Sequence, residues 1–319
     1  MSDLEVFVQQ LITGLSNGMI IALIALGYTM VYGIVELINF AHGDLFMLGA
    51  FMALTLIGVL GIQDQTFATA PLQCGLLFVL VPLFCAFVNG AIDHFAYRPL
   101  RKAPRLAPLV SAIGVSFVLL NIGLFWGGLP MDVFNNGHAA SAPKDFPALV
   151  SNDNLLGDES NVGFTATDLL VVGVALPLMV GLTALVRLTK LGKAMRAVAQ
   201  DPTAASLMGI DVNGIITKTF MLGGAIGGFA SVVYALYNNT IHFQMGFRVG
   251  IDAFTAAVLG GIGSFPGAVL GGLVIGLVRA MSDQYIATQW TNITVFSILV
   301  MVLVFRPSGL LGSRRREKV

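Results

Sequence analysis

Residues 11–35 read LITGLSNGMIIALIALGYTMVYGIV and contain no Asp, Glu, Lys or Arg. A helix needs about 20 apolar residues to cross the hydrocarbon core of a bilayer. The glycines of this stretch lie inside the apolar run, as they do in helices that pack closely in lipid. Residues 11–35 therefore predict a membrane-spanning helix.

The rest of the chain has a matching composition. Of its 319 residues, 56% are hydrophobic and 11% are charged, whereas about 25% are charged in an ordinary soluble domain. The 17 basic and 17 acidic residues give a formal net charge of zero, which disfavours a nucleic acid as partner. The composition predicts an all-α polytopic protein of the lipid bilayer and disfavours a soluble enzyme.

Further apolar runs predict the other spans. Full spans are expected at residues 11–35, 45–61, 73–96, 107–127, 168–188, 216–237, 266–282 and 289–305. The shorter piece from Ile251 to Ile262 predicts a re-entrant or half-spanning helix, broken by Gly260, Gly261 and Gly263. We therefore expect one transmembrane domain over residues 1–319, with about eight full spans and one partial span.

Basic residues predict the orientation, because cytoplasmic loops retain Lys and Arg. They form three clusters: Arg98, Arg101, Lys102 and Arg105; Arg187, Lys190, Lys193, Arg196 and Lys218; Arg306, Arg314, Arg315, Arg316 and Lys318. The three clusters lie on the same side of the membrane if residues 251–262 are counted as a membrane crossing. Residues 188–218 and the tail 306–319 are then cytoplasmic and the N-terminus is external. Asp3 and Glu5 at the N-terminus argue against a cleavable signal peptide.

The long polar loop at residues 128–166 is expected on the external side. Its acidic residues outnumber Lys144, its single basic residue. Turn formers such as Asn135, Asn136 and Gly137 fill it. The loop is either a solvated connector or a docking surface for an external partner.

Several motifs resemble catalytic or metal-binding signatures but lack the structural context that those signatures need. Gly14 to Gly18 match the G-x-S-x-G elbow of hydrolases, but that elbow needs a strand-to-helix turn. Glycines four apart instead predict close helix packing, and the spacing recurs at Gly223/Gly227, Gly224/Gly228, Gly267/Gly271 and Gly272/Gly276. The sequence has no ATP-binding P-loop, its four histidines are isolated, and we expect no metal site. Cys74 and Cys85 lie about 16 Å apart on one helix face and are expected to be free thiols.

Residues 35–44, VELINFAHGD, interrupt two apolar runs with Glu36, Asn39, His42 and Asp44. One interpretation is a tight turn with Asp44 capping the next helix. The other is an unwound segment that lines a substrate path, because polar groups at membrane depth often mark such paths.

Residues 188–218 contain two short helical patterns. Lys193, Arg196 and Gln200 share one face of the first. Asp201 and Pro202 predict the cap and first position of the second, which a glycine closes. This pattern suits insertion into a groove on another protein, although an ordinary basic loop is the alternative.

These segments carry a family resemblance. Gly192 to Ala197, Asp201-Pro202, Ala204-Ala205 and Met208 to Ile210 resemble the cytoplasmic coupling region of ABC-importer permeases for branched-chain amino acids. The runs 39–50, 256–268 and 306–312 are similar to other motifs of the same family, in the same order. The resemblance covers most of the chain and is greatest to the H-type permease of leucine–isoleucine–valine (Liv) importers.

The resemblance implies partners and a location. Such a chain pairs with a second, M-type permease in the bacterial inner membrane, and a periplasmic binding protein delivers the amino acid. Two cytoplasmic ATPase subunits use ATP and Mg²⁺, so the chain itself is expected to be no enzyme and to bind no cofactor.

The resemblance also implies two sets of functional residues. ATPase coupling is expected at Gly192, Lys193, Ala194, Arg196, Ala197, Asp201, Ala204, Ala205 and Gly209. The substrate pathway is expected at Asn39, Phe40, Gly43, Gly260, Gly261 and Gly263.

Other functions stay open at the level of sequence. Close relatives in this family carry urea or short amides. A self-sufficient ion-coupled amino-acid transporter is a second alternative, with Glu36, Asp252 and Arg279 as coupling charges. A structural subunit without its own pathway is the third.

Overall fold

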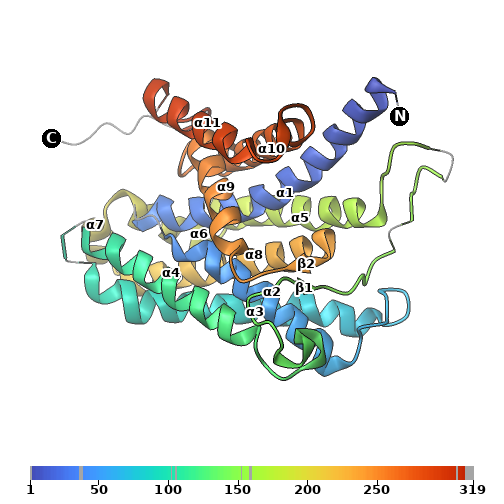
Figure 1. Ribbon diagram of the computed structural model, residues 1–319. Coiled ribbons are helices and arrows are strands. Elements are labelled where there is room, and N and C mark those ends of the chain that lie inside the picture. The colour runs from blue at the N-terminus through green and yellow to red at the C-terminus, as the bar shows by residue number, and fades with distance from the viewer. Residues whose placement is uncertain are drawn as a thin grey trace.

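Long apolar runs of the sequence form helices in the computed structural model, which describes residues 2–35, 39–101, 103–104, 106–151, 153–157, 160–306 and 308–312 (Figure 1). The α-helices are α1 (Asp3–Val35), α2 (Ala41–Leu60), α3 (Pro71–Ile92), α4 (Leu106–Trp126), α5 (Ala166–Leu188), α6 (Lys190–Gln200), α7 (Pro202–Leu207), α8 (Val212–Asn238), α9 (Met245–Gly260), α10 (Phe265–Ser282) and α11 (Thr291–Phe305). The remaining elements are the π-helical turns η1 (Asp93–Tyr97) and η4 (Asp283–Ala287), the 3-10 helices η2 (Arg98–Leu100) and η3 (Asp132–Gly137), and the paired strands β1 (Lys144–Asp145) and β2 (Thr240–Ile241).

The helices confirm the prediction of an all-α polytopic membrane protein. Among the described residues, 7 helices are long and apolar enough to cross a membrane. They are α1, α2, α3 with its extension to Leu100, α4, α5, α8, and α10 with its extension to Ala287. The eighth predicted span is the shorter apolar helix α11, whose 15 residues cover only about 22 Å.

Helix α9 differs from the short apolar piece expected at residues 251–262. It begins at Met245, six residues upstream of the predicted start, and has 16 residues. The apolar pattern did not predict this start, because Arg248 and Asp252 interrupt the apolar run. Gly260 is the last helical residue, so the predicted break falls instead at Gly261 and Gly263, with φ of 104° and 90°.

Glycines place α1 in direct backbone contact with α10. A Cβ on Gly18 would lie 2.9 Å from the Cα of Leu273, and one on Gly276 would overlap the Cα of Gly18. Gly14 meets α10 one turn further along, at Leu277. Small residues thus bring the two backbones together, which confirms the predicted packing role of Gly14 and Gly18.

Helix α8 uses its two glycine stripes in the same way on opposite sides. Gly223 packs against Val31 of α1, whereas Gly224 and Gly228 pack against Cys85 and Pro82 of α3. Both cysteines are free and buried in the described part of the chain. The central helices therefore form one closely packed bundle.

The two ends of the bundle differ in what they carry. The start of α1 and the short helix α7 lie at opposite ends of the bundle in Figure 1. Arg101 donates a hydrogen bond to Asn213 at the start of α8, so the first two basic clusters meet at this end. Lys102, Arg105 and residues 313–319 lie outside the described residues. The long loop between α4 and α5 lies at the other end (Figure 1).

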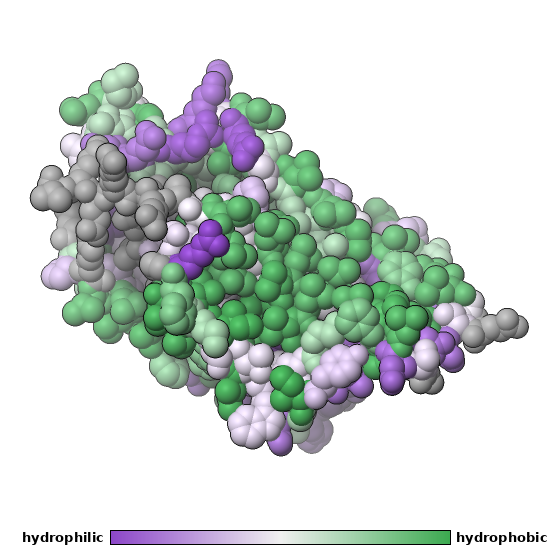
Figure 2. Space-filling model, turned by 90° about the horizontal axis from the view of Figure 1, so that it is seen from above, coloured by the Kyte–Doolittle hydropathy of each residue, from purple (hydrophilic) through white to green (hydrophobic). Residues whose placement is uncertain are grey.

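A broad apolar surface covers the face of the molecule shown in Figure 2, and hydrophilic residues gather toward its edges. Large apolar side chains of α11, including Ile293, Val300 and Val304, are more than half exposed. Exposed apolar area of this extent is expected of a surface that faces lipid or another membrane protein.

The backbone contact between α1 and α10 gives a first prediction. Gly276→Ala should destabilise the protein by about 2 kcal/mol, because the added methyl group overlaps backbone that cannot move aside. Gly173→Ala on α5, where a Cβ meets nothing within 4 Å, is the matched control. Thermal unfolding of both purified variants measures the effect, and equal melting temperatures would contradict the packing.

Candidate functional site

The two groups of predicted pathway residues lie close to the C-terminal part of α1. Asn39 and Phe40 precede α2, and residues 261–264 connect α9 to α10. A Cβ on Gly33 of α1 would lie 3.6 Å from the Cα of Gly263. Residues 36–38, including Glu36, lie outside the described residues.

Aromatic rings join these segments. The ring centroid of Phe40 lies 6.2 Å from that of Phe254 on α9. Tyr28 of α1 lies 6.4 Å from Phe254 and meets His42 edge-on at 4.8 Å. Phe40 is 39% exposed, so its ring is available at the edge of this cluster.

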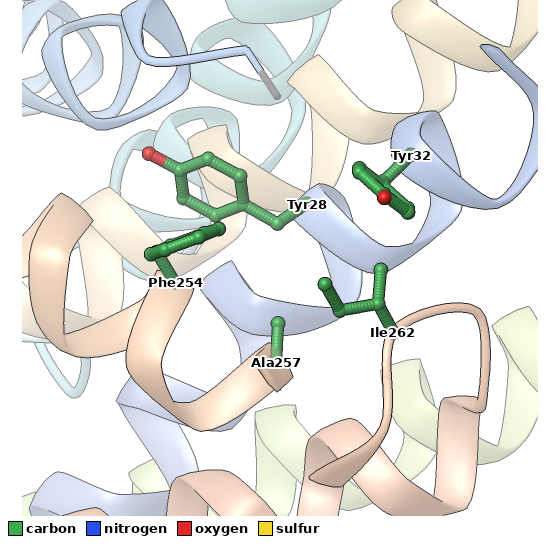
Figure 3. A pocket seen from close by; sticks show the side chains of 5 residues that line it. All are labelled: Tyr28, Tyr32, Phe254, Ala257 and Ile262. Atoms are coloured by element: carbon green, nitrogen blue, oxygen red, sulfur yellow. The ribbon is translucent and has the colours of Figure 1, made fainter. Parts of the chain in front are cut away.

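A small pocket opens beside the cluster (Figure 3). It is lined by Tyr28, Tyr32, Phe254, Ala257 and Ile262 and has a cavity volume of about 10 Å³. Its walls come from α1, α9 and the loop that follows α9, with Ile262 standing between Gly261 and Gly263. The pocket walls are therefore apolar side chains with two tyrosines.

The predicted pathway glycines do not line this pocket. Gly43 packs against the backbone of Gly246, Gly260 against Gly267, and Gly261 against Gly312. Gly263 is exposed, with its left-handed φ of 90° and no atom within 4 Å of a Cβ. These glycines lie in the segments around the pocket. Ile262, between Gly261 and Gly263, forms one of the pocket walls.

Two polar residues near the start of α2 bind other helices. The Asn39 Oδ1 atom accepts a hydrogen bond of 2.7 Å from the Tyr97 hydroxyl. The prediction that Asp44 caps α2 is wrong, because the helix begins at Ala41 and Phe40 occupies the cap position. Asp44 instead accepts a hydrogen bond from Ser116 of α4.

Three side-chain caps define the segment between α5 and α8. The Gly192 N–H donates to Thr189 Oγ1 at 3.1 Å, and the Thr203 and Ala204 N–H groups donate to Asp201 at 2.8 and 3.0 Å. The Gly214 N–H donates to Asp211 at 3.1 Å. Each cap satisfies an N–H group that a helix start leaves unpaired. The predicted cap at Asp201 is confirmed, and α6 and α7 are two fixed short helices.

The predicted coupling residues divide into inward and outward positions. Gly192 and Ala205 are buried, and a Cβ on Gly192 would overlap the carbonyl of Val186. Arg196 donates to the carbonyls of Val186 and Arg187 at the end of α5, where a cation stabilises the helix dipole. The exposed set consists of Lys193, Arg196, Asp201, Ala204 and Gly209; Ala194 and Ala197 are half-buried.

Sequence reasoning missed the two most exposed apolar side chains of this segment. Leu207 and Met208 are each 83% exposed, directly before the left-handed Gly209. The sequence feature that could have identified them is a pair of adjacent large apolar residues within a stretch of small and polar ones. Exposed apolar groups at the polar end of a membrane protein indicate an interface.

At the opposite end, a buried lysine orders the polar loop. Lys144 is 1% exposed, and its Nζ donates to the carbonyls of Phe134, His138 and Ala139 at 3.2, 3.1 and 3.1 Å. Burial lowers the pKa of the Lys144 ammonium below its usual 10.5. Strand β1 also pairs with β2, which joins residues 144–145 to the end of α8. This part of the loop is an ordered surface.

Two of the three charges considered for ion coupling, Asp252 and Arg279, pair with each other, whereas Glu36 lies outside the described residues. Asp252 and Arg279 lie 2.5 Å apart, and Arg279 also donates to Asn292 at 2.9 Å. The pair thus joins α9, α10 and α11. Breaking a buried ion pair leaves an uncompensated charge, so the observed pairing stabilises these helices against separation.

These features define a multi-pass helical membrane protein with a polar loop, ordered around Lys144, at one end and two capped short helices with an exposed apolar tip at the other. Residues 10–305 match the protein family described as "Branched-chain amino acid transport system / permease component". The chain belongs to this family of permeases.

Relatives cover the whole chain. It is 40% identical to the high-affinity branched-chain amino acid transport system permease protein BraD of Pseudomonas aeruginosa, over 100% of both chains. It is 37% identical to the permease protein LivH of Escherichia coli, over 98% of both chains. A probable LivH of Methanocaldococcus jannaschii is 27% identical over 92% of this chain and 89% of its own length. No solved structure matches.

The position of Lys144 gives a second prediction. Lys144→Met should raise hydrogen–deuterium exchange in residues 134–145 about tenfold, because three carbonyls lose their donor. Lys218→Met, at an exposed position on α8, should leave exchange in this loop unchanged. Equal protection of the loop in both variants would contradict the role of Lys144.

Proposed function

We propose that this chain is the membrane-spanning permease subunit of an ATP-driven importer that carries branched-chain amino acids across the bacterial inner membrane. The observation that carries the proposal is the full-length identity of 40% to BraD and 37% to LivH. The chain is a transport subunit, and ATP hydrolysis with Mg²⁺ takes place on its partners.

The partners in this proposal are a second permease of the M type, two cytoplasmic ATPase subunits and a periplasmic amino-acid-binding protein. The chain is 29% identical to a probable permease protein LivM of M. jannaschii, over 40% of its own length. This sequence similarity between the two permease types supports a pair of similar chains around one pathway.

The end with α6, α7 and the C-terminus faces the cytoplasm in this proposal, and the N-terminus faces the periplasm. Exposed Lys190 and Lys193 and the basic residues nearby support this orientation through the positive-inside rule. The ordered polar loop, residues 128–166, then faces the binding protein.

The ATPase binds the docking segment, which we define as residues 190–209. Its exposed tip, Leu207 and Met208, enters an apolar groove on the ATPase, while Lys193, Ala204 and Asp201 surround the contact. The buried Gly192 and the guanidinium of Arg196 hold α6 against the end of α5. Movement of the ATPase is thereby passed to the bundle through a stiff segment.

The docking tip gives a third prediction. Leu207→Asp combined with Met208→Asp should weaken co-purification with the ATPase subunits by about tenfold or more, since an apolar anchor is replaced by charge. Leu155→Asp combined with Leu156→Asp is the matched control, because these neighbours are 53% and 54% exposed on the opposite polar loop. Full ATPase association of the first variant would refute the docking site.

The substrate path passes the pocket beside α1 and α9. Its apolar walls suit the side chain of leucine, isoleucine or valine, and backbone groups of the adjoining loop suit the charged ends. Asn39, Phe40 and Gly43 hold one side of this region, and Gly260, Gly261 and Gly263 shape the loop that carries Ile262.

The pocket gives a fourth prediction. Ile262→Trp should fill the pocket and lower leucine uptake by about tenfold, with ATPase association unchanged. The control Ile293→Trp places the same bulk on α11, where Ile293 is 54% exposed. Normal uptake by the Ile262 variant would exclude this pocket from the path.

The comparisons favour this function over the alternatives. The relatives described above are named as branched-chain amino acid permeases, and none of them as a carrier of urea or amides. The mutual pairing of Asp252 and Arg279 leaves neither charge isolated for ion coupling. Uptake by this chain alone, in liposomes without ATP, would support the ion-coupled transporter instead.

A further inference from the structure

The first turn of α8, which directly follows the docking segment, is fastened to the end of α3. The Thr217 hydroxyl lies 2.6 Å from Asp93 Oδ2, and 3.1 Å from the carbonyl of Asn213. Arg101 binds both Asp93 oxygens, at 2.6 and 2.8 Å, and also donates to Asn213. Asp93 is fully buried. Both contacts come from one guanidinium nitrogen, and charge-assisted hydrogen bonds of this kind are stronger than neutral ones.

Asp93 is also the first residue of the π-helical turn η1, and Tyr97 is the last. The Arg98 N–H donates to the Asp93 carbonyl, five residues back. Such turns are rare in α-helices, and those that do occur are often found at functional sites. The extra residue per turn allows Asp93 to face α8 while Tyr97 faces the start of α2.

Tyr97 completes a connection to the candidate pathway. Its side chain is 4% exposed, and its hydroxyl donates to Asn39 at 2.7 Å. Asn39 immediately precedes Phe40, whose ring packs against Phe254 of the pocket. The Asn39 Nδ2 atom has no hydrogen-bond partner among the described residues, so the Tyr97 hydroxyl is the contact that orients this amide.

We propose that Thr217, Arg101, Asp93, Tyr97 and Asn39 form a relay of positioning residues. It transmits displacement of the docking segment to the connection between α1 and α2. The proposal rests on the proposed function, because that function gives the two ends of the relay their roles. Beyond the proposed function, the relay proposal names the residues that join the docking segment to the pathway. It also identifies η1 as the element that moves.

The order of the contacts explains how the relay joins its two ends. Asp93 is bound by groups from the start of α8 and from the α3–α4 connection, so α8 cannot shift there without displacing η1. Tyr97 lies on the same short turn and moves with it. A shift of η1 then changes the distance between the Tyr97 hydroxyl and Asn39, and with it the position of Phe40 at the pocket edge.

The test uses the complete transporter in proteoliposomes and measures leucine uptake per ATP hydrolysed. Tyr97→Phe and Thr217→Val each remove one hydroxyl and retain nearly the same volume. Each should lower uptake per ATP by about fivefold, with the amount of co-purified ATPase unchanged. The double variant should lose no more than either single variant, because both interrupt one relay.

Matched variants separate the relay from general loss of stability. Thr183→Val removes a hydroxyl that bonds only within α5, to the Met179 carbonyl, and Tyr234→Phe changes a tyrosine whose ring packs on Phe46. Both should keep wild-type uptake per ATP. Thr217→Ser retains the hydroxyl and should restore coupling.

Wild-type uptake per ATP in Tyr97→Phe or Thr217→Val would overturn the relay while leaving ATPase docking intact. Losses that multiply in the double variant would also overturn it, since they would show two independent contacts. Absence of ATP-dependent leucine uptake by the unsubstituted complex would overturn the proposed function itself.

Discussion

The contact between the backbones of α1 and α10 is the constraint on which the arrangement depends. Gly14 and Gly18 meet Leu277 and Leu273 at distances that leave no room for larger side chains. In lipid, apolar side chains gain little by leaving their surroundings, so helix association depends on close packing of this kind. Because α1 also contacts α8 through Gly223, one central helix aligns both halves of the bundle. The pocket is built on this helix, from Tyr28 and Tyr32.

Polar groups then divide the bundle into two functional ends. Lys144 orders the loop at one end through three carbonyl contacts. At the other end, the caps at Thr189, Asp201 and Asp211 hold two short helices whose apolar tip remains exposed. In the proposed importer, transport driven from one side needs a stiff connection from that tip to the pathway. The proposed relay assigns this connection to the buried bonds of Asp93 and Tyr97.

The sequence predicted the parts of this structure that depend on local pattern. Apolar runs identified the spans, glycine spacing identified the faces of α1, α8 and α10 that touch, and Asp201 with Pro202 identified the start of α7. Helical patterns also identified the two short helices between residues 188 and 218, for which the family resemblance implies a docking role. Local pattern failed where a distant partner decides the outcome. The start of α9 was missed because Arg248 interrupts the apolar run between Met245 and Ile251. Asp44 was assigned to a cap, whereas its partner Ser116 lies in α4. The contact between Tyr97 and Asn39 spans 58 residues and follows from a π-turn that no simple period predicts.

The central claim is that force from the ATPase enters this chain at the tip of the docking segment. Chemical cross-linking from Met208→Cys in the assembled complex tests this most directly, because the native Cys74 and Cys85 are buried. The account predicts a cross-link from position 208 to an ATPase subunit that changes in yield when ATP is added. A position 208 that reacts freely with a water-soluble thiol reagent in the complex, without joining the ATPase, would contradict it.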